Sequence, residues 1–175
     1  METAVATSVE NPPLLRHLDR RLPRYTWYPT ALEFHRDVNQ ATYAHWLESL
    51  PAQGEVSLYL HVPFCAELCL YCACHTTVAR RYGPIEAYVE LLEREVALVG
   101  RHLGARRKAV HVHWGGGTPT FLDEMQLGGV FASIAKHFDL GSELSIEIDP
   151  RVTSVSQLKT LRRLGFDRVS MGVQD

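Results

Sequence analysis

The sequence predicts an α/β protein with a parallel sheet, and two observations support this fold class. Short stretches rich in Val, Leu, Ile and Tyr alternate with longer amphipathic stretches over residues 55–174. The resulting order of four strands separated by three helices is typical of parallel strands joined by crossover helices. Such helices suit an α/β barrel as well as an open sheet. We expect a partial (β/α) barrel of about three and a half strand–helix units.

The first 52 residues precede this alternation. Residues 1–22 are polar, contain proline and show no apolar period, so we expect a flexible N-terminal arm. Residues 23–52 begin with the aromatic segment PRYTWYPTALEF and are expected to pack over another part of the molecule. A short helix around Ala41–Leu50 ends this region, because Pro51 cannot continue it. The partial barrel is then expected over residues 53–175.

The first two strand–helix units follow in order. A strand is predicted over Glu55–Val62, and Pro84 suits the first turn of the next helix. A second strand is predicted over Ala109–Trp114, and Asp123 can begin the second helix. Apolar residues at helical spacing define the inward face of each helix. They are Ile85, Val89, Leu92, Val96, Val99 and Leu103, then Leu127, Val130, Phe131, Ile134 and Phe138.

A third unit and a fourth strand complete the pattern. Leu144–Asp149 is predicted as a strand, and a helix runs from Ser154 or Ser156 to Leu164, where Gly165 stops it. Arg168–Gln174 begins a fourth strand, whose edge would be exposed if nothing followed. We therefore expect the chain to be the N-terminal part of a longer protein.

The composition argues against several classes of function. A net charge of −2 gives no electrostatic reason to expect nucleic acid or an anionic membrane as a partner. No stretch approaches the ~20 apolar residues of a membrane span, and the N-terminus lacks the pattern of a secretory signal. Cysteines without a signal peptide fit a reducing compartment, so we expect a cytoplasmic protein.

All four cysteines lie within ten residues, in the pattern C-x3-C-x2-C-x-C. A structural zinc site would usually have two cysteine pairs separated by a longer loop. A catalytic dithiol could use Cys69 and Cys72, but it would leave Cys65 and Cys74 unexplained. Thiolates at this density suit an iron–sulfur cluster better.

Polar groups recur at the ends of the later strands. Gly115–Gly117 follow the second strand and would let backbone amides approach a ligand closely. In the third strand, Glu147 and Asp149 alternate with apolar residues and so share the face turned away from the helices. Because ligands of α/β folds bind at the carboxyl ends of the strands, we expect a polar ligand there.

C-x3-C-x2-C after a strand resembles the radical S-adenosylmethionine (SAM) superfamily. That resemblance implies a partial barrel of the radical SAM type and a [4Fe–4S] cluster held by Cys65, Cys69 and Cys72. The fourth iron would remain open for SAM. A reduced cluster would cleave SAM to give a 5′-deoxyadenosyl radical.

Five segments together resemble the oxygen-independent coproporphyrinogen III oxidase family: PRYTWYPTALEF, YLHVPFCAELCLYCAC, HWGGGTPT, IEIDPR and SMGVQD. The resemblance implies oxidative decarboxylation of two propionates of coproporphyrinogen III to the vinyl groups of protoporphyrinogen IX. It also implies two SAM molecules, an electron donor that the sequence does not identify, and a monomer at full length. The 175-residue chain by itself is expected to be inactive.

The same resemblance assigns roles to individual residues. Catalytic roles fall on Tyr59, Glu147 and Cys74. The first SAM would contact Tyr59, Gly116 and Glu147, whereas the second would contact Tyr71, Gly117, Thr118 and Gln174. Other interpretations remain open, because Tyr59 could belong to ordinary strand packing and Tyr71 could only shield the cluster.

Cys74 separates the oxidase from its relatives. Haem chaperones of the superfamily usually carry an aromatic residue at this fourth position and lack the RYT-YPT segment, so a haem chaperone is the first alternative. A zinc-binding module is the second. The resemblance also implies that the N-terminal segment over residues 23–52 covers the active site. Within it, Arg24 and Tyr25 are candidates to meet substrate carboxylates, although Arg24 could equally cap a loop. Trp27 departs from the small residue that the family usually has there.

Overall fold

The computed structural model describes residues 33–70 and 72–172. The chain divides into two compact units, Met1–Val38 and Asn39–Asp175, and the second contains the sheet. The predicted arm over residues 1–22 lies outside the described residues, as does most of the aromatic segment. The four predicted site residues outside them are Arg24, Tyr25, Tyr71 and Gln174.

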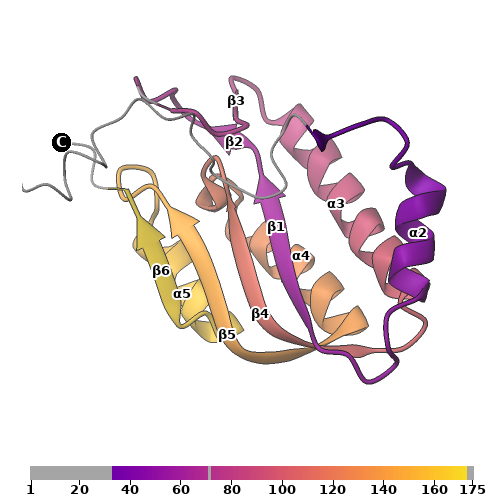
Figure 1. Cartoon of the computed structure of the whole chain (residues 1–175). Coiled ribbons are helices and arrows are strands. Elements are labelled where there is room, and N and C mark those ends of the chain that lie inside the picture. The colour runs from indigo at the N-terminus through magenta and orange to yellow at the C-terminus, as the bar shows by residue number, and fades with distance from the viewer. Residues whose placement is uncertain (1–32, 71, 173–175) are drawn as a thin grey trace, which may run out of the picture. The chain divides into compact units, whose positions relative to one another are not determined.

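Four parallel strands form the main sheet, in the order β1-β4-β5-β6, which confirms the predicted parallel α/β fold (Figure 1). Their bounds are Val56–Val62 for β1, Arg107–Gly116 for β4, Phe138–Ile148 for β5 and Arg168–Met171 for β6. Within the described residues the sheet is open, with β1 and β6 at its edges.

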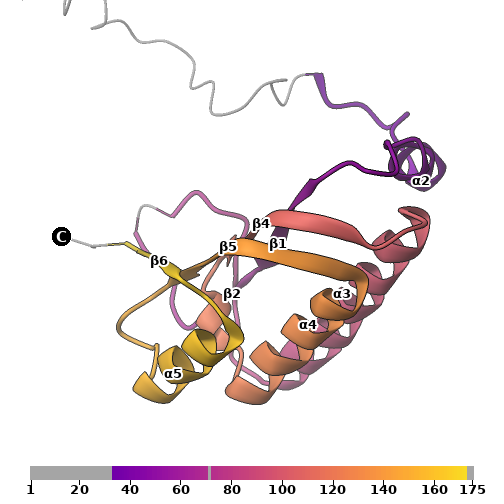
Figure 2. The ribbon, with the colours of Figure 1, turned by 90° about the horizontal axis from the view of Figure 1, so that it is seen from below.

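Three helices cover one face of this sheet (Figure 2): α3 (Gly83–His102), α4 (Glu124–His137) and α5 (Val155–Leu164). Two of them begin with a capping box, in which the side chain of Asp123 or Ser154 accepts a hydrogen bond from the backbone three residues on. Helix α5 ends at Gly165, whose φ of 96° lies in the left-handed region that favours glycine. These signals explain why the helices begin and end close to the predicted positions.

The core lies between the helices and the sheet. Strand alternation sends Leu60, Trp114 and Ile146 into it, and Trp114 and Ile146 are fully buried. The predicted helix faces are confirmed by the buried residues Ile85, Val89, Leu92 and Val96 of α3 and Leu127, Val130 and Ile134 of α4. Phe138 is also buried, but it begins β5 instead of ending the helix. The helical prediction was wrong there because no loop separates α4 from β5.

A shorter helix, α2 (Gln40–Glu48), packs against α3 and belongs to the same unit as the sheet. Glu48 Oε1 lies 2.8 Å from His102 Nδ1. The buried guanidinium of Arg107 donates to the backbone carbonyls of Leu50 and Pro51, which fixes the connection from α2 to β1. The sequence had grouped this helix with residues 23–52.

Over residues 33–70 and 72–172, no helix combines the length and apolar character that crossing a bilayer requires.

Candidate active site

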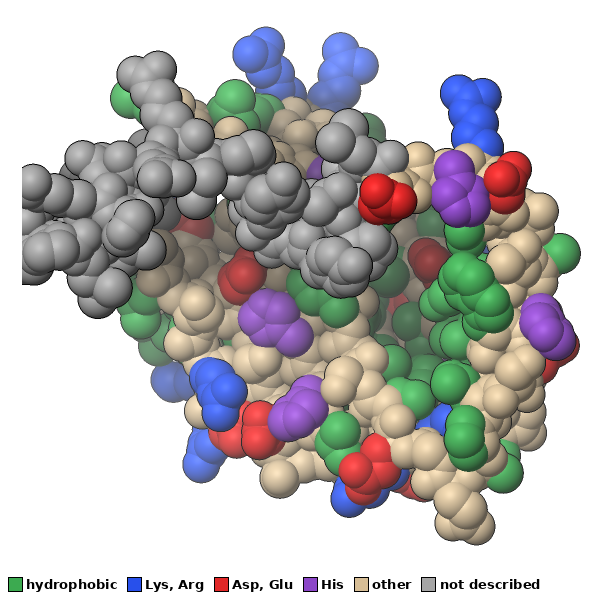
Figure 3. All heavy atoms as spheres, in the orientation of Figure 1, with side chains coloured by type: hydrophobic (Ala, Val, Ile, Leu, Met, Phe, Trp, Pro, Cys, Tyr) green, Lys and Arg blue, Asp and Glu red, His purple; other side chains and the backbone are tan. Residues whose placement is uncertain are grey.

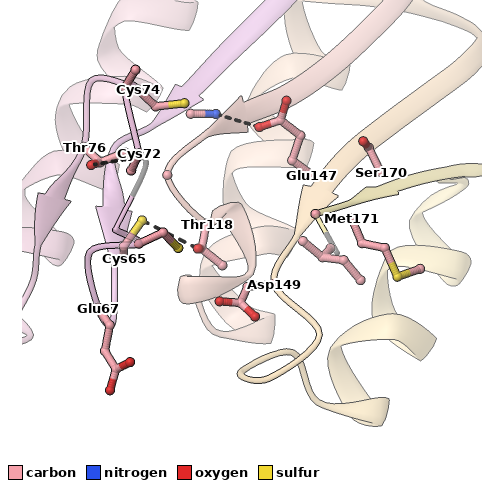
Figure 4. A pocket seen from close by; sticks show the side chains of 16 residues that line it. Cys65, Glu67, Cys72, Cys74, Thr76, Thr118, Glu147, Asp149, Ser170 and Met171 are labelled. Atoms are coloured by element: carbon pink, nitrogen blue, oxygen red, sulfur yellow. Dashed lines mark hydrogen bonds between the residues drawn. The ribbon is translucent and has the colours of Figure 1, made fainter. Parts of the chain in front are cut away.

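A cavity of about 380 Å³ lies at the carboxyl ends of the strands (Figure 4). This volume falls within the ~300–1,000 Å³ of typical small-molecule pockets. Residues from the cysteine loop, from the glycine run at the end of β4 and from the ends of β5 and β6 meet there. They are Cys65, Glu67, Cys69, Cys72, Ala73, Cys74, Thr76, Gly116, Gly117, Thr118, Glu147, Ile148, Asp149, Ser170, Met171 and Gly172.

The cysteine loop is anchored at both ends by a small parallel ladder, which the sequence did not predict. It pairs β2 (Phe64–Cys65) with β3 (Thr77–Val78). The Ala79 amide donates to the Cys65 carbonyl at 3.1 Å, so the chain returns close to its starting point. All four cysteines are free thiols and border the same cavity.

The glycine run holds this loop against the sheet. The amides of Gly117 and Thr118 donate to the carbonyls of Val62 and Phe64, each at 2.8 Å. A Cβ atom on Gly117 would lie 2.7 Å from the Phe64 carbonyl oxygen and 2.9 Å from Cys65 Sγ. Gly116 has a φ of 115°, a backbone conformation that residues with a side chain rarely adopt. The glycines are therefore needed for close approach to the cysteines.

Three of the four sulfurs have a polar partner outside the cysteine motif. The Thr118 hydroxyl donates to Cys65 Sγ at 3.7 Å, and Cys72 Sγ lies 3.9 Å from the Thr76 hydroxyl. Cys69 Sγ accepts from Nη2 of Arg151 at 3.9 Å. Burial raises the pKa of the Cys65 thiol, and the hydroxyl of Thr118 acts in the opposite direction.

Glu147 reaches the cavity from the face of β5 that the helices leave open. Its Oε2 accepts from the Gly116 amide at 3.1 Å, and its Oε1 lies 3.4 Å from His113 Nε2. The other ring nitrogen of His113 lies 2.7 Å from the Ser145 hydroxyl. Two groups of the neighbouring strand β4 thus fix the carboxylate before any ligand binds.

Tyr59 does not line the cavity. It lies in the middle of β1, opposite His113 in the register. Its ring stacks on His113 with centroids 5.9 Å apart, and its hydroxyl lies 3.0 Å from His61 Nδ1. Burial, followed by the nearby charge of Glu147, raises the pKa of Tyr59.

The open face of the sheet carries charged and histidine side chains toward the amino ends of the strands (Figure 3). Lys108 Nζ lies 2.8 Å from Glu55 Oε1, and His111 Nδ1 lies 2.9 Å from Glu143 Oε2. Arg168 Nη2 approaches the same Glu143 oxygen at 3.8 Å. This face is polar along its length, as expected for a surface that is not part of an apolar core.

The donor set fits an iron–sulfur cluster. In such clusters each cysteine binds its own iron, so the sulfurs need not converge on one point. Among residues 33–70 and 72–172, no three His, Cys, Asp or Glu side chains are arranged to hold one metal ion, as a structural zinc site would require. Cys65, Cys69 and Cys72 share the cavity with Cys74, whose thiol pKa is raised by burial.

The predicted site residues fall into three groups. The cavity brings together the four cysteines with Gly116, Gly117, Thr118 and Glu147. Tyr59 lies beside it, and the four residues outside the described ranges are not placed. Sequence patterns predict no role for His113, Ser145 or Arg151. The alternation of His113 with Gly115 and of Ser145 with Glu147 could have indicated the first two.

Comparisons with known proteins agree with this geometry. The Radical SAM superfamily matches residues 59–175. An oxygen-independent coproporphyrinogen III oxidase from Bradyrhizobium diazoefficiens is 45% identical, over 89% of this chain and 35% of that protein. The protein of the same name from Pseudomonas aeruginosa is 42% identical, over 93% of this chain and 36% of that protein.

A solved structure gives the same result. Coproporphyrinogen III oxidase from Escherichia coli, described as a radical SAM enzyme, superposes with a TM-score of 0.79 at 38% identity. The match covers 86% of this chain and 35% of that one. The chain therefore spans about a third of the length of the relatives it matches.

Proposed function

The chain belongs to the radical SAM superfamily, and on that premise we propose that it is part of an oxygen-independent coproporphyrinogen III oxidase. The proposed reaction is the oxidative decarboxylation of two propionates of coproporphyrinogen III, which yields protoporphyrinogen IX. One observation carries the proposal. The three cysteines of C-x3-C-x2-C, the glycine run and Glu147 meet around one cavity at the strand ends, in a chain 45% identical to a protein of that name.

Superfamily membership implies a [4Fe–4S] cluster and SAM, which together supply the electron and the radical precursor for hydrogen abstraction. Cys65, Cys69 and Cys72 would hold the cluster. Cys74 lines the same cavity and would remain outside the ligand set. Its presence favours the oxidase over a haem chaperone, which usually has an aromatic residue at this position.

The remaining residues would bind and orient SAM. Glu147 is placed to accept a hydrogen bond from an amino group, because Gly116 and His113 already fix its carboxylate at the cavity. We assign Gly116, Glu147 and Tyr59 to one SAM molecule, although Tyr59 would have to reach the ligand from beside the cavity.

A second SAM molecule is assigned to Tyr71, Gly117, Thr118 and Gln174. Of these, Thr118 already donates its hydroxyl to Cys65 Sγ, so its contact with a ligand would compete with that hydrogen bond. Arg24 and Tyr25 are assigned to the substrate carboxylates. The electron donor is not identified, and we propose a monomeric protein working in the cytoplasm.

The test is an anaerobic assay of the full-length protein that contains this chain, with SAM, a reductant and coproporphyrinogen III. We expect 5′-deoxyadenosine and a divinyl product. A protein with a reconstituted cluster that forms neither would contradict the proposal. The 175-residue chain alone is expected to form no product, because it supplies only about a third of the length of the relatives; turnover by this chain would show that expectation wrong.

A further inference from the structure

Arg151 reaches the cysteine loop from the opposite side of the cavity. It follows β5, and its Nη2 donates to Cys69 Sγ at 3.9 Å, although 82 positions separate the two residues in sequence. The contact is independent of the ladder that anchors the loop at Cys65. It therefore joins the loop to the end of β5 at a second point.

Asp149 holds the guanidinium in this orientation. Its Oδ1 accepts from Arg151 Nε at 3.0 Å and its Oδ2 from Nη2 at 2.6 Å, a forked contact that fixes the plane of the group. The Arg151 backbone amide also donates to Oδ1 at 2.9 Å. The Asp149 side chain is only 22% exposed. The carboxylate and the short loop together position the arginine before any ligand binds.

The loop that carries this pair is itself braced. The Thr153 hydroxyl donates to the Asp149 carbonyl at 2.7 Å and lies 2.6 Å from the Thr120 hydroxyl, which follows the glycine run. These contacts tie the loop after β5 to the segment after β4. The position of Asp149, which holds the Arg151 guanidinium, is therefore built into the fold.

The three cysteines of the motif thus differ in their partners. Cys65 and Cys72 lie beside hydroxyl groups, whereas Cys69 lies beside a cation. Hydrogen bonds and charge near the cysteine sulfurs are among the factors that set the reduction potential of an iron–sulfur cluster. The Asp149–Arg151 pair is neutral overall, so its effect depends on the N–H donor facing the sulfur.

We infer that Arg151, held by Asp149, is a positioning residue that raises the reduction potential of the cluster ligated by Cys69. The cluster gains negative charge when it takes up an electron. An N–H donor beside a ligand sulfur stabilises that reduced state. This inference rests on the proposed function, because it requires a cluster on the three cysteines.

The experiment is an anaerobic potentiometric titration of the reconstituted full-length protein, followed by the electron paramagnetic resonance signal of the reduced cluster. For Arg151→Gln, we expect the ratio of reduced to oxidised cluster at a fixed potential to fall by up to about tenfold, which is about 59 mV for a one-electron couple. Arg151→Lys should retain part of the effect. The control Arg162→Gln removes the same charge from the exposed surface of α5 and should leave the potential unchanged.

Arg151→Gln alone also leaves the Asp149 carboxylate without its ion-pair partner, which could itself lower the potential. The double variant Asp149→Asn, Arg151→Gln removes that carboxylate together with the guanidinium donor. It keeps the net charge of the pair, and its potential should still lie below that of the wild type. A double variant with the wild-type potential, or Arg151→Gln with an unchanged potential, would overturn the inference and leave the proposed function intact. A wild-type protein that assembles no cluster on these cysteines would overturn both.

Discussion

The two faces of the sheet come from the same strands, because successive side chains point to opposite sides. The face under the helices receives Leu60, Trp114 and Ile146, which are almost completely buried. The other face receives Tyr59, His113 and other polar groups that contact one another across strands. The covered face stabilises the fold, whereas the open face, where it meets the strand ends, positions the groups proposed to do chemistry. Substitutions on the covered face should therefore lower stability, whereas substitutions near the strand ends of the open face should impair cluster or ligand binding.

The largest expected effect is the loss of cluster assembly when a cysteine of the loop is replaced. Cys69→Ala should abolish cluster assembly, because a cubane without one of its three protein ligands is not retained. Iron and sulfide content and the visible absorbance of the anaerobically reconstituted protein would measure this. Cys74→Ala is the matched control and should retain the cluster. Loss of the cluster in Cys74→Ala with retention in Cys69→Ala would reverse the proposed ligand assignment.

A substitution on the covered face should act on stability instead. Trp114 is completely buried and meets Phe166 edge to face, with ring centroids 5.5 Å apart. Trp114→Ala should lower the free energy of unfolding by about 3–5 kcal/mol, as measured by urea denaturation of the apoprotein. Tyr59→Phe, on the open face, should change it far less. Equal losses in the two variants would contradict the division between the faces.

A substitution at Gly117 should affect both the stability of the fold and the assembly of the cluster. Gly117→Ala would place a Cβ atom 2.7 Å from the Phe64 carbonyl oxygen, so the cysteine loop would have to move. We expect a loss of about 1–3 kcal/mol, as for other overpacked sites, and a lower yield of cluster. Gly128→Ala is the control, since its Cβ meets nothing within 4 Å and alanine favours a helix. Normal cluster assembly in Gly117→Ala would contradict the close-approach argument.

The smallest expected effect on stability comes from removing a polar contact on the helix side of the sheet, between Tyr82 and Asp123. The Tyr82 hydroxyl donates to Asp123 Oδ2 at 2.6 Å, which lowers the pKa of Asp123 and raises the pKa of Tyr82 to about 12. Because the folded pKa of Asp123 is lowered, its contribution is complete above its ordinary pKa of 3.8 and is lost as the pH falls further.

The contribution of Tyr82 has the opposite dependence. It is complete below the ordinary tyrosine pKa of 10 and is lost as the pH rises through about 12. Tyr82→Phe should therefore cost about 0.5–1.5 kcal/mol at pH 7 and much less at pH 2. Denaturation at the two pH values measures this difference, and a cost independent of pH would argue against the contact.

Local rules account for most of what the sequence predicted. Apolar spacing located the buried faces of α3 and α4, and strand alternation placed Glu147 on the open face. The failures depended on features without a local signal. Phe138 continues the helical spacing of α4 but begins the next strand, because the chain passes from helix to sheet without a loop.

The contact between Arg151 and Cys69 could not be predicted from the sequence for a different reason. Its residues lie 82 positions apart, and only the folded sheet brings the end of β5 to the cysteine loop. Strand alternation predicts which face a residue occupies, but it does not predict which distant loop that residue meets. The partner of each cysteine sulfur therefore had to be found in the structure.

The most direct test of the account is the response of the reduced cluster to SAM. With three cysteine ligands, the proposed cluster would leave one iron open for SAM, and Gly116 and Glu147 line the same cavity. Addition of SAM to the reduced, reconstituted protein should therefore change the electron paramagnetic resonance signal, and Glu147→Gln should weaken that response. A reduced cluster whose signal is the same with and without SAM would contradict the account.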